Sequence, residues 1–392
     1  MKKILFVTTG ALPVPAVNGG AVEKLVDMLL QDKKITDKFD IDVYSRYDKK
    51  SENIIKNYNV RYINEDSVMF KIKRIIRFCI NKLSNKYYGN EYITQVVKDI
   101  KKNNLKYDIV VIENSPEYAL ILKKYLKCKF VLHLHNDYLN KERKLSKEIV
   151  YCYDLILAIS NYIKNRVLEV NSNANVKVLY NGVNLNKFDI TNIDNRKYKE
   201  KYLLNDDDFV FGYVGRIVKE KGIKELVKSF CDITTGEKTK LLIVGSSGYG
   251  KDKESEYLRE VKDIARKKEG KIIFTGFVNH DEMQSVCSLI DVGVYPSRCN
   301  EAFGLSVAEM LALEKPVIVS DRGALPEIVN YECAIIVKDD DNFISNLKEA
   351  LNKVLLMRKD EFKDLKKNAR KQVLKFSYTN YCNNMIDYLE KI

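Results

Sequence analysis

Short apolar runs rich in β-branched residues alternate with stretches of helical periodicity along the whole sequence, and this alternation constrains the fold most strongly. Buried strands that alternate with helices are typical of a parallel sheet covered by helices on both faces. The first series has strands at 3–8, 41–44, 109–112, 130–133 and 155–159, with helices at 21–30, 92–102 and 116–125. The second has strands at 209–214, 240–244, 272–275, 292–295, 317–319 and 334–337, with helices at 222–230, 256–268, 306–313 and 344–356. The sequence therefore predicts an α/β chain of two doubly wound, Rossmann-like domains.

A turn signal at Asn181-Gly182 and the polar segment 189–208 separate the two series. We place the N-terminal domain at 1–180 and the C-terminal domain at 181–376, and we expect a helix at about 377–392 to pack back on the first domain. Two cores suit a chain of 392 residues, because single cores stop growing at roughly 250–300 residues. Ligands of open parallel sheets bind outside the carboxyl ends of the strands, so we expect the chemistry in those loops, across a cleft between the domains.

The charge of the chain is uneven. Residues 1–180 hold 32 Lys and Arg against 20 Asp and Glu, whereas residues 181–392 hold 35 against 34. A basic domain suggests an anionic partner such as a phosphorylated substrate or an anionic membrane, although a general lysine bias is the alternative. Neither domain shows a recognition helix or an aromatic-basic RNA motif, which argues against nucleic acid. The eight cysteines include no CxxC pair, and no apolar run approaches the ~18 residues that span a bilayer. We therefore expect a reducing, cytoplasmic location.

Two loops of the second domain combine residues suited to a phosphorylated sugar. Arg216 and Lys221 follow the strand at 209–214, and such a pair on one loop can hold the two phosphates of a diphosphate. Further along, Glu301 and Glu309 bracket an apolar stretch that opens a helix at Gly304. Free N–H groups at a helix start bind anions, and carboxylates accept hydrogen bonds from paired hydroxyls. A favourable helix cap is the alternative explanation for a single glutamate there.

The first domain offers two weaker candidates. Gly19 and Gly20 end the loop before the helix at 21–30, where their backbone N–H groups could approach an anion, although a plain connection is the simpler explanation. In FVLHLH at 130–135, the side chains of His133 and His135 point to the same face of the strand. His135 lies at the carboxyl end, so we favour it as functional over a structural hydrogen-bonding role, and we interpret His133 as structural.

Residues 68–83 (VMFKIKRIIRFCINKL) form an amphipathic pattern at helical spacing. One arc is apolar, and the other carries basic residues that include Lys71, Lys73, Arg74 and Arg77. Two interpretations remain open. The apolar arc packs on the N-terminal sheet and leaves a solvated basic face, or the helix lies on an anionic membrane surface.

Longer motifs carry a family resemblance. They are GYVGRIVKEKG from Gly212, FTGFV from Phe274, EAFGLSVAE from Glu301 and PVIVSDRGALPEIV from Pro316, with looser matches in P-x-x-NGG-x-x-E from Pro15 and in the Asn181-Gly182-Val183 turn. Together they resemble the retaining glycosyltransferases of family four, which have the GT-B fold. The resemblance covers nearly the whole chain. One departure is Asn184, where the family often has Asp after the turn.

The resemblance implies a role for each candidate. Arg216 and Lys221 would neutralise the donor diphosphate beside Gly215, and Glu301 would bind the hydroxyls of the donor sugar. The other implied donor contacts are Glu309 with the ribose, the backbone of Phe303, Gly304 and Leu305 with the sugar, that of Phe277 and Val278 with the base, and Gly19 and Gly20 with the phosphates. His135 matches the active-site histidine of the family.

The function expected from this resemblance is transfer of a hexose or N-acetylhexosamine from a nucleotide-diphosphate sugar, most simply UDP-linked, to a lipid-linked or polymeric glycan of the cell envelope. An epimerase of sugar nucleotides and a non-catalytic envelope-assembly protein are the alternatives. We expect no metal and no cofactor, because the D-x-D patterns at 40–42 and 206–208 do not lie in loops after strands. The chain would work in the cytoplasm, with peripheral contact to the inner face of the membrane as the second interpretation of residues 68–83.

Overall fold

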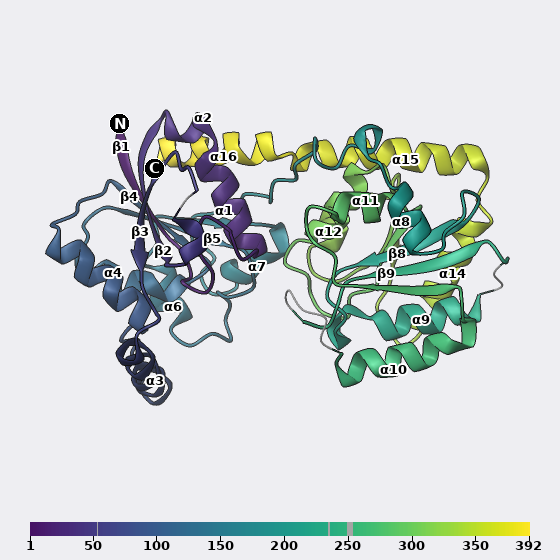
Figure 1. Ribbon diagram of the computed structural model, residues 1–392. Helices are drawn as coiled ribbons and strands as arrows, with labels where there is room; N and C mark the ends of the chain where they lie inside the picture. The colour runs from purple at the N-terminus through teal and green to yellow at the C-terminus, as the bar shows by residue number, and fades with distance from the viewer. Residues whose placement is uncertain (53, 234–235, 249–253) are drawn as a thin grey trace. The chain divides into compact units, whose positions relative to one another are not determined.

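The structure of the chain, a computed structural model, describes residues 1–52, 54–233, 236–248 and 254–392 (Figure 1). The chain divides into two compact units. Unit 1 comprises Met1–Gly182 with Thr379–Ile392, and unit 2 comprises Val183–Tyr378. The boundaries fall two residues after those that the sequence suggested.

Unit 1 is built on a parallel sheet of seven strands with the order β3-β2-β1-β4-β5-β6-β7. Its central strands are continuous apolar runs and are buried on both faces, as a parallel sheet between helices requires. The edge strands β3 and β7 were absent from the sequence prediction, because they are short and only partly buried and so lack a continuous apolar run. The strands are β1 (Lys2–Val7), β2 (Phe39–Arg46), β3 (Asn59–Ile63), β4 (Ile109–Glu113), β5 (Lys129–Leu134), β6 (Leu155–Ala158) and β7 (Val176–Val178).

The helices of unit 1 connect these strands, and the C-terminal helix returns to the same unit. Lys2 Nζ donates to the carbonyl of Leu389 over 3.2 Å, and the Tyr388 hydroxyl donates to Val178 O over 3.2 Å. The helices are α1 (Ala21–Gln31), α2 (Lys33–Thr36), α3 (Val68–Leu83), α4 (Glu91–Lys102), α5 (Ala119–Leu122), α6 (Ser146–Val150), α7 (Asn161–Leu168) and α16 (Tyr378–Lys391), with 3-10 turns η1 (Lys49–Ser51) and η2 (Pro116–Tyr118).

Unit 2 repeats the design with six parallel strands in the order β10-β9-β8-β11-β12-β13. The strands are β8 (Phe209–Val214), β9 (Thr239–Val244), β10 (Ile272–Gly276), β11 (Val292–Tyr295), β12 (Val317–Ser320) and β13 (Ala334–Val337). The helices are α8 (Arg196–Lys201), α9 (Ile223–Asp232), α10 (Glu256–Ala265), α11 (Met283–Ser288), α12 (Leu305–Ala312), α13 (Leu325–Ile328), α14 (Phe343–Leu355) and α15 (Lys359–Val373), with 3-10 turns η3 (Ile190–Asn192), η4 (Lys219–Lys221), η5 (Arg266–Lys268) and η6 (Leu374–Phe376). The prediction of two doubly wound α/β domains is confirmed.

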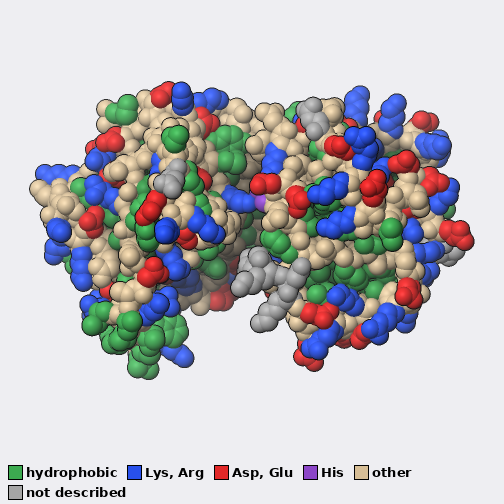
Figure 2. All heavy atoms as spheres, viewed as in Figure 1, with side chains coloured by type: hydrophobic (Ala, Val, Ile, Leu, Met, Phe, Trp, Pro, Cys, Tyr) green, Lys and Arg blue, Asp and Glu red, His purple; other side chains and the backbone are tan. Residues whose placement is uncertain are grey.

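Helix α3 has the bounds that the sequence pattern gave, but its orientation differs from one interpretation. Its apolar arc is exposed, and Phe70 is the buried residue of the helix. Figure 2 shows these side chains as a green patch over α3, at the lower left. The interpretation in which the apolar arc packs on the sheet is therefore wrong. The basic arc is also not exposed throughout, contrary to both interpretations. Arg77 points toward the buried Glu91 and pairs with it over 2.8 Å.

Candidate active site

The loops after β8 and β11 lie against each other in unit 2. Gly222 closes η4 in the left-handed region at φ 70°, and a Cβ there would lie 1.9 Å from the carbonyl oxygen of Pro296. Only glycine permits both that conformation and that approach. The glycine thereby brings the Lys221 end of one loop to the Ser297 and Glu301 end of the other.

A short ion pair joins these two loops. Lys221 Nζ lies 2.5 Å from Glu301 Oε1, and the Ser297 hydroxyl donates to the same oxygen over 2.5 Å. About a fifth of each charged side chain is exposed, so the pair is shielded yet reachable. The sequence placed the two charges on separate loops; the structure brings them together. Ser297 was not among the expected residues, and its place in the loop that follows a buried strand was the available signal.

The loop after β12 holds Glu301 from the other side. Residues 301 and 323 form a parallel bridge, and Ala324 N donates to the Glu301 carbonyl over 2.8 Å. Gly323 has φ 60°, and a Cβ there would lie 2.3 Å from that carbonyl oxygen. The backbone at Glu301 is thus fixed by neighbouring loops, so its side chain can be held in one position.

The segment after Glu301 enters α12. Gly304 precedes the helix at φ 111°, in a conformation that favours glycine, and the helix begins at Leu305. Phe303 is buried, with its ring in an edge contact with Phe376 at 5.6 Å between centroids. Glu309 lies in the second turn and is half-buried. The backbone N–H groups at the start of this eight-residue helix follow shortly after Glu301 in the chain.

The remaining expected residues of unit 2 follow the same sheet. Gly215 and Arg216 come directly after β8, and both are half-buried. Phe277 and Val278 come directly after β10, where the Phe277 side chain is 43% exposed and Val278 is buried. All of these residues follow carboxyl ends of parallel strands of one sheet, which is where open α/β sheets bind ligands.

In unit 1, a buried carboxylate lies between two histidines. Glu113 ends β4 and pairs in register with His133 on β5. Its Oε2 atom lies 3.0 Å from His133 Nδ1 and 2.8 Å from His135 Nε2, and all three side chains are buried. Glu113 was not among the expected residues. A glutamate that ends an otherwise apolar strand was the signal that could have identified it.

Burial and proximity set the charges of this group. Burial opposes ionisation of Glu113, but the two imidazoles outweigh it and lower its pKa to about 2. Burial lowers the pKa of His135 to about 4; His133 adds to this effect, and Glu113 opposes it. At neutral pH, His135 is therefore neutral and Glu113 ionised. The carboxylate can only accept, so His135 Nε2 donates and Nδ1 is the nitrogen left as an acceptor.

The same three residues are where a metal could be considered. Their ligand atoms all lie within 4.8 Å of one another, and His and Glu are ligands of zinc. Glu113 Oε2, however, already forms a hydrogen bond with His135 Nε2 over 2.8 Å and lies 3.0 Å from His133 Nδ1, so the three side chains contact one another directly. Glu113 Oε1 has no hydrogen-bond partner among the described residues. The expectation of no metal stays a prediction, which metal analysis of the purified protein can test.

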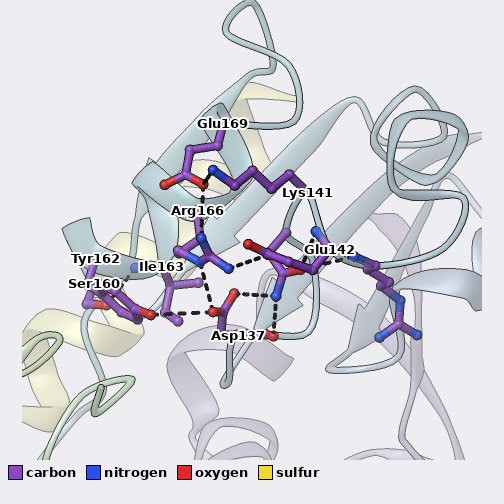
Figure 3. A network of polar contacts seen from close by, with 10 residues as sticks. Asp137, Lys141, Glu142, Ser160, Tyr162, Ile163, Arg166 and Glu169 are labelled. Carbon is purple, nitrogen blue, oxygen red and sulfur yellow. Dashed lines mark hydrogen bonds and ion pairs between the residues drawn. The ribbon is translucent and has the colours of Figure 1, made fainter. Parts of the chain in front are cut away.

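The loop after His135 is held by an arginine network (Figure 3). Arg166 on α7 pairs with Asp137 over 2.9 Å, with Glu142 over 2.5 Å and with Glu169 over 2.9 Å. Three ion pairs fix a guanidinium better than one, because its rotamer freedom is lost only once. The network therefore fixes the chain two residues beyond His135.

The first loop of unit 1 ends at a buried acid. Gly19 and Gly20 have φ 80° and 91°, and α1 begins directly after Gly20. Glu23 in the first turn of α1 is 7% exposed, and burial raises its pKa, to which the nearby Glu113 charge contributes. The N-G-G-x-x-E pattern thus leads from an open glycine turn to an acid near the Glu113 group.

A pocket of about 370 Å³ lies in unit 1 between the first loop, α3 and α4. It is mixed in character, with apolar walls and several charged groups. Its lining includes Thr9, Gly10, Glu65, Phe70, Arg74, Phe78, Asn81, Tyr87, Glu91 and Glu117. A pocket of this size and polarity suits a small polar ligand or a sugar ring.

Comparisons with known proteins match both halves of the chain. The sequence profile described as Glycosyltransferase Family 4 matches residues 39–187, and the profile described as Glycosyl transferases group 1 matches residues 194–372. The chain belongs to glycosyltransferase family 4. The first profile of this glycosyltransferase ends at residue 187, shortly after the start of unit 2 at Val183, and the second lies wholly within unit 2.

Relatives of this family 4 glycosyltransferase include proteins of polysaccharide synthesis. The putative glycosyltransferase YtcC of Bacillus subtilis is 26% identical and is matched over 95% of this chain and 87% of its own length. The capsular polysaccharide biosynthesis glycosyltransferase CapM of Staphylococcus aureus is 36% identical over 50% of this chain and 51% of its own length. The crystal structure of Anabaena HepE in complex with UDP and glucose is 18% identical, covers all of both chains and superposes with a TM-score of 0.73. These findings confirm the family and the GT-B fold.

Proposed function

We propose that this glycosyltransferase moves a hexose or N-acetylhexosamine from a UDP-sugar to a hydroxyl of a lipid-linked or polymeric envelope glycan, with retention of configuration. The observation that carries the proposal is the Lys221–Glu301 pair, held by glycines where β8 and β11 end. The positive charge of Lys221 can neutralise a diphosphate, and the carboxylate of Glu301 can accept hydrogen bonds from sugar hydroxyls. The complex of HepE with UDP and glucose and the capsular role named for CapM support the classes of donor and acceptor.

In the proposed reaction, the acceptor oxygen bonds to the anomeric carbon on the face that the diphosphate leaves. The bond between that carbon and the phosphate oxygen breaks, and its electron pair goes to the diphosphate. The proton of the acceptor hydroxyl goes to the departing phosphate. Lys221 and Arg216 stabilise the charge that develops on the leaving group, and fixed groups of this kind act most strongly in a shielded site. Because cationic side chains and the N–H groups at α12 meet this charge, the proposal needs no metal.

The other groups have supporting roles in the proposal. Glu309 and the backbone at Phe277 and Val278 hold the nucleoside, and the backbone at Phe303, Gly304 and Leu305 holds the sugar. In unit 1, the backbone N–H of Gly20 is assigned to an anion, whereas that of Gly19 donates to Ala16 O over 3.1 Å. His135, neutral and with Nδ1 as an acceptor, binds a donor or acceptor hydroxyl. The pocket beside α3 receives the acceptor, and we place the enzyme at the inner face of the cell membrane.

The first test measures donor binding and transfer together. The panel is UDP-glucose, UDP-galactose and UDP-N-acetylglucosamine, screened by thermal shift, since a ligand that binds the native state raises Tm. For the stabilising donor, Arg216→Ala and Glu301→Gln should each lower kcat by about 10²-fold or more and leave the Tm of the free protein within a few degrees. Glu237→Gln, exposed at the amino end of β9, is the control.

Three outcomes would overturn the assignment. Full turnover by Arg216→Ala with the stabilising donor would remove that residue from the reaction. An isomerised sugar nucleotide, formed without any acceptor, would instead identify an epimerase. No shift with any nucleotide sugar would favour a non-catalytic assembly protein.

A further inference from the structure

Helix α3 turns an apolar face to the solvent. Eight large apolar side chains along it are between 44% and 87% exposed, and the first turn is capped by Ser67, whose hydroxyl accepts from Phe70 N over 3.1 Å. Scattered apolar residues are normal on a protein surface, but a continuous apolar face marks an interaction site. Seven of the eight side chains lie in one arc, and the eighth, Phe78, lies outside it beyond Lys71 and Lys82. The seven are Val68, Met69, Ile72, Ile75, Ile76, Ile80 and Leu83.

Polar contacts on the opposite side fix this orientation. Arg77 Nε lies 2.8 Å from Glu91 Oε2, Arg74 lies 3.9 Å from Glu65, and both carboxylates are buried. Asn81 Nδ2 donates to the Gly89 carbonyl over 3.1 Å. Rolling the helix to bury its apolar face would leave Glu91 buried without Arg77, which is costly, and would leave Glu65 with Arg46 alone, at 4.0 Å. The orientation of α3 with its apolar face exposed is therefore the stable one.

Lysines border the exposed face on both sides. At 100° per residue, Lys71 and Lys82 lie along one margin and Lys73 along the other. All three are exposed, and none forms an ion pair with a described residue. The helix carries no acidic residue at all. An apolar stripe with lysine margins complements a surface that is apolar inside and anionic at its edge.

We propose that α3 docks this protein on an anionic phospholipid bilayer, with its apolar face among the acyl chains and Lys71, Lys73 and Lys82 at the headgroups. A second copy of the chain fits less well, because pairing two such helices would bring their lysines together without an acidic partner on either. In the residues that the structure describes, no helix is both long and apolar enough to cross a bilayer, so the contact is with one leaflet.

Docking has a consequence for the pocket beside α3. Phe70, Arg74, Phe78 and Asn81 of this helix line it, so the membrane helix is also a wall of the pocket. A lipid-linked acceptor would then reach the pocket from the bilayer, an extension that rests on the proposed function. The docking itself does not depend on transferase activity.

The test is flotation of the full chain, without substrates, with vesicles of mixed phosphatidylglycerol and phosphatidylcholine and with vesicles of phosphatidylcholine alone. The wild type should bind the anionic vesicles, and less so at high salt. The double variant Ile72→Glu/Ile76→Glu should weaken binding by about tenfold or more. Its matched control is Ile55→Glu/Leu203→Glu, which changes two exposed apolar residues elsewhere and should bind like the wild type.

The lysines are tested separately. Neutralising Lys71, Lys73 and Lys82 to Gln should weaken binding to the anionic vesicles by about fivefold per lysine. Wild-type-like binding by the Ile72→Glu/Ile76→Glu variant would overturn the proposal. So would equal binding to neutral vesicles, or a wild-type dimer that this variant converts to a monomer with no vesicle binding at all, because the face would then belong to self-association. Since no sugar is used, a failed transferase assay leaves this result interpretable.

Discussion

At the scale of single residues, the two candidate centres use their charges differently. Lys221 and Glu301 are both partly exposed, and each can exchange its partner for a ligand without leaving a buried charge. Glu113 has no such freedom, because it is buried between His133 and His135. The Lys221–Glu301 centre is therefore suited to bind a ligand and release it. The second is suited to hold one imidazole in one protonation state and one orientation.

That difference predicts how stability depends on pH. The pKa of His135 is lowered to about 4 in the folded chain from its ordinary 6.5, so the unfolded chain takes up a proton first as the pH falls. The contribution of His135 to the free energy of unfolding is complete above about pH 6.5. It falls progressively towards pH 4, by about 2–3 kcal/mol. The lowered pKa of Glu113 adds a loss in the same direction below about pH 4.5.

His135→Gln should therefore reduce the fall in Tm between pH 6.5 and pH 4.5 by several degrees, since about 2–4 °C corresponds to 1 kcal/mol in a domain of this size. His280→Gln, which removes an exposed imidazole, is the control and should keep the wild-type fall. The same pH dependence in His135→Gln as in the wild type would contradict the assigned charge state.

At the scale of elements, the strands and most helices could be predicted, because buried parallel strands are continuous apolar runs. The central strand β8 and the edge strand β13 have the bounds that the sequence gave. The edge strand β3 could not be found, since its partial burial leaves no apolar run. The orientation of α3 was also beyond the pattern, because periodicity locates an apolar arc and not what covers it. The ion pair of Arg77 with Glu91 fixes the orientation of α3, and Glu91 lies on another helix, so the spacing of residues along α3 cannot indicate it.

The candidate site was predicted unevenly for a related reason. Lys221 and Glu301 could be proposed from motifs, but their contact depends on Gly222 and Gly323, which bring three loops together. Glu113 was missed because it belongs to no motif and acts through a neighbouring strand. Side chains that act through their neighbours in the folded chain leave little signal in the sequence.

The loop geometry predicts the effect of one methyl group. Gly222→Ala would place a Cβ 1.9 Å from the Pro296 carbonyl oxygen at φ 70°, so one of the two loops must move. We expect a lower Tm and a loss of transfer of about 10²-fold, because displacement by about 1 Å has that cost. Gly270→Ala shares the positive φ without a contact and Gly236→Ala has neither, so the first should lower Tm slightly and both should keep activity. Normal transfer by Gly222→Ala would contradict the role given to this loop contact.

At the scale of the whole molecule, the chain begins and ends in unit 1. Helix α16 contributes Tyr381, Cys382, Met385, Ile386 and Leu389 to the buried residues of that unit. Burial of Met385, Ile386 and Leu389 stabilises the folded state by about 1.5–3 kcal/mol for each side chain, and a domain is stable by only about 5–15 kcal/mol in total.

Deletion of residues 379–392 should therefore unfold unit 1 and leave unit 2 folded. Limited proteolysis with mass spectrometry would show cleavage throughout unit 1 and a protected fragment of unit 2. Asn383→Ala/Asn384→Ala, which changes two exposed positions of α16, should leave both units protected. Protection of unit 1 in the truncated chain would show that the helix is dispensable.

The central claim is that, in this family 4 glycosyltransferase, the acceptor attacks the donor sugar on the same face that the diphosphate leaves. The reaction is placed at the Lys221–Glu301 pair. NMR of the product formed with the UDP-sugar that the thermal-shift panel selects tests it most directly. We predict that the product keeps the anomeric configuration of the donor. The Glu301→Gln variant should form no product, although its Tm should stay near that of the wild type. A product of inverted configuration, or an unchanged yield from Glu301→Gln, would contradict the account.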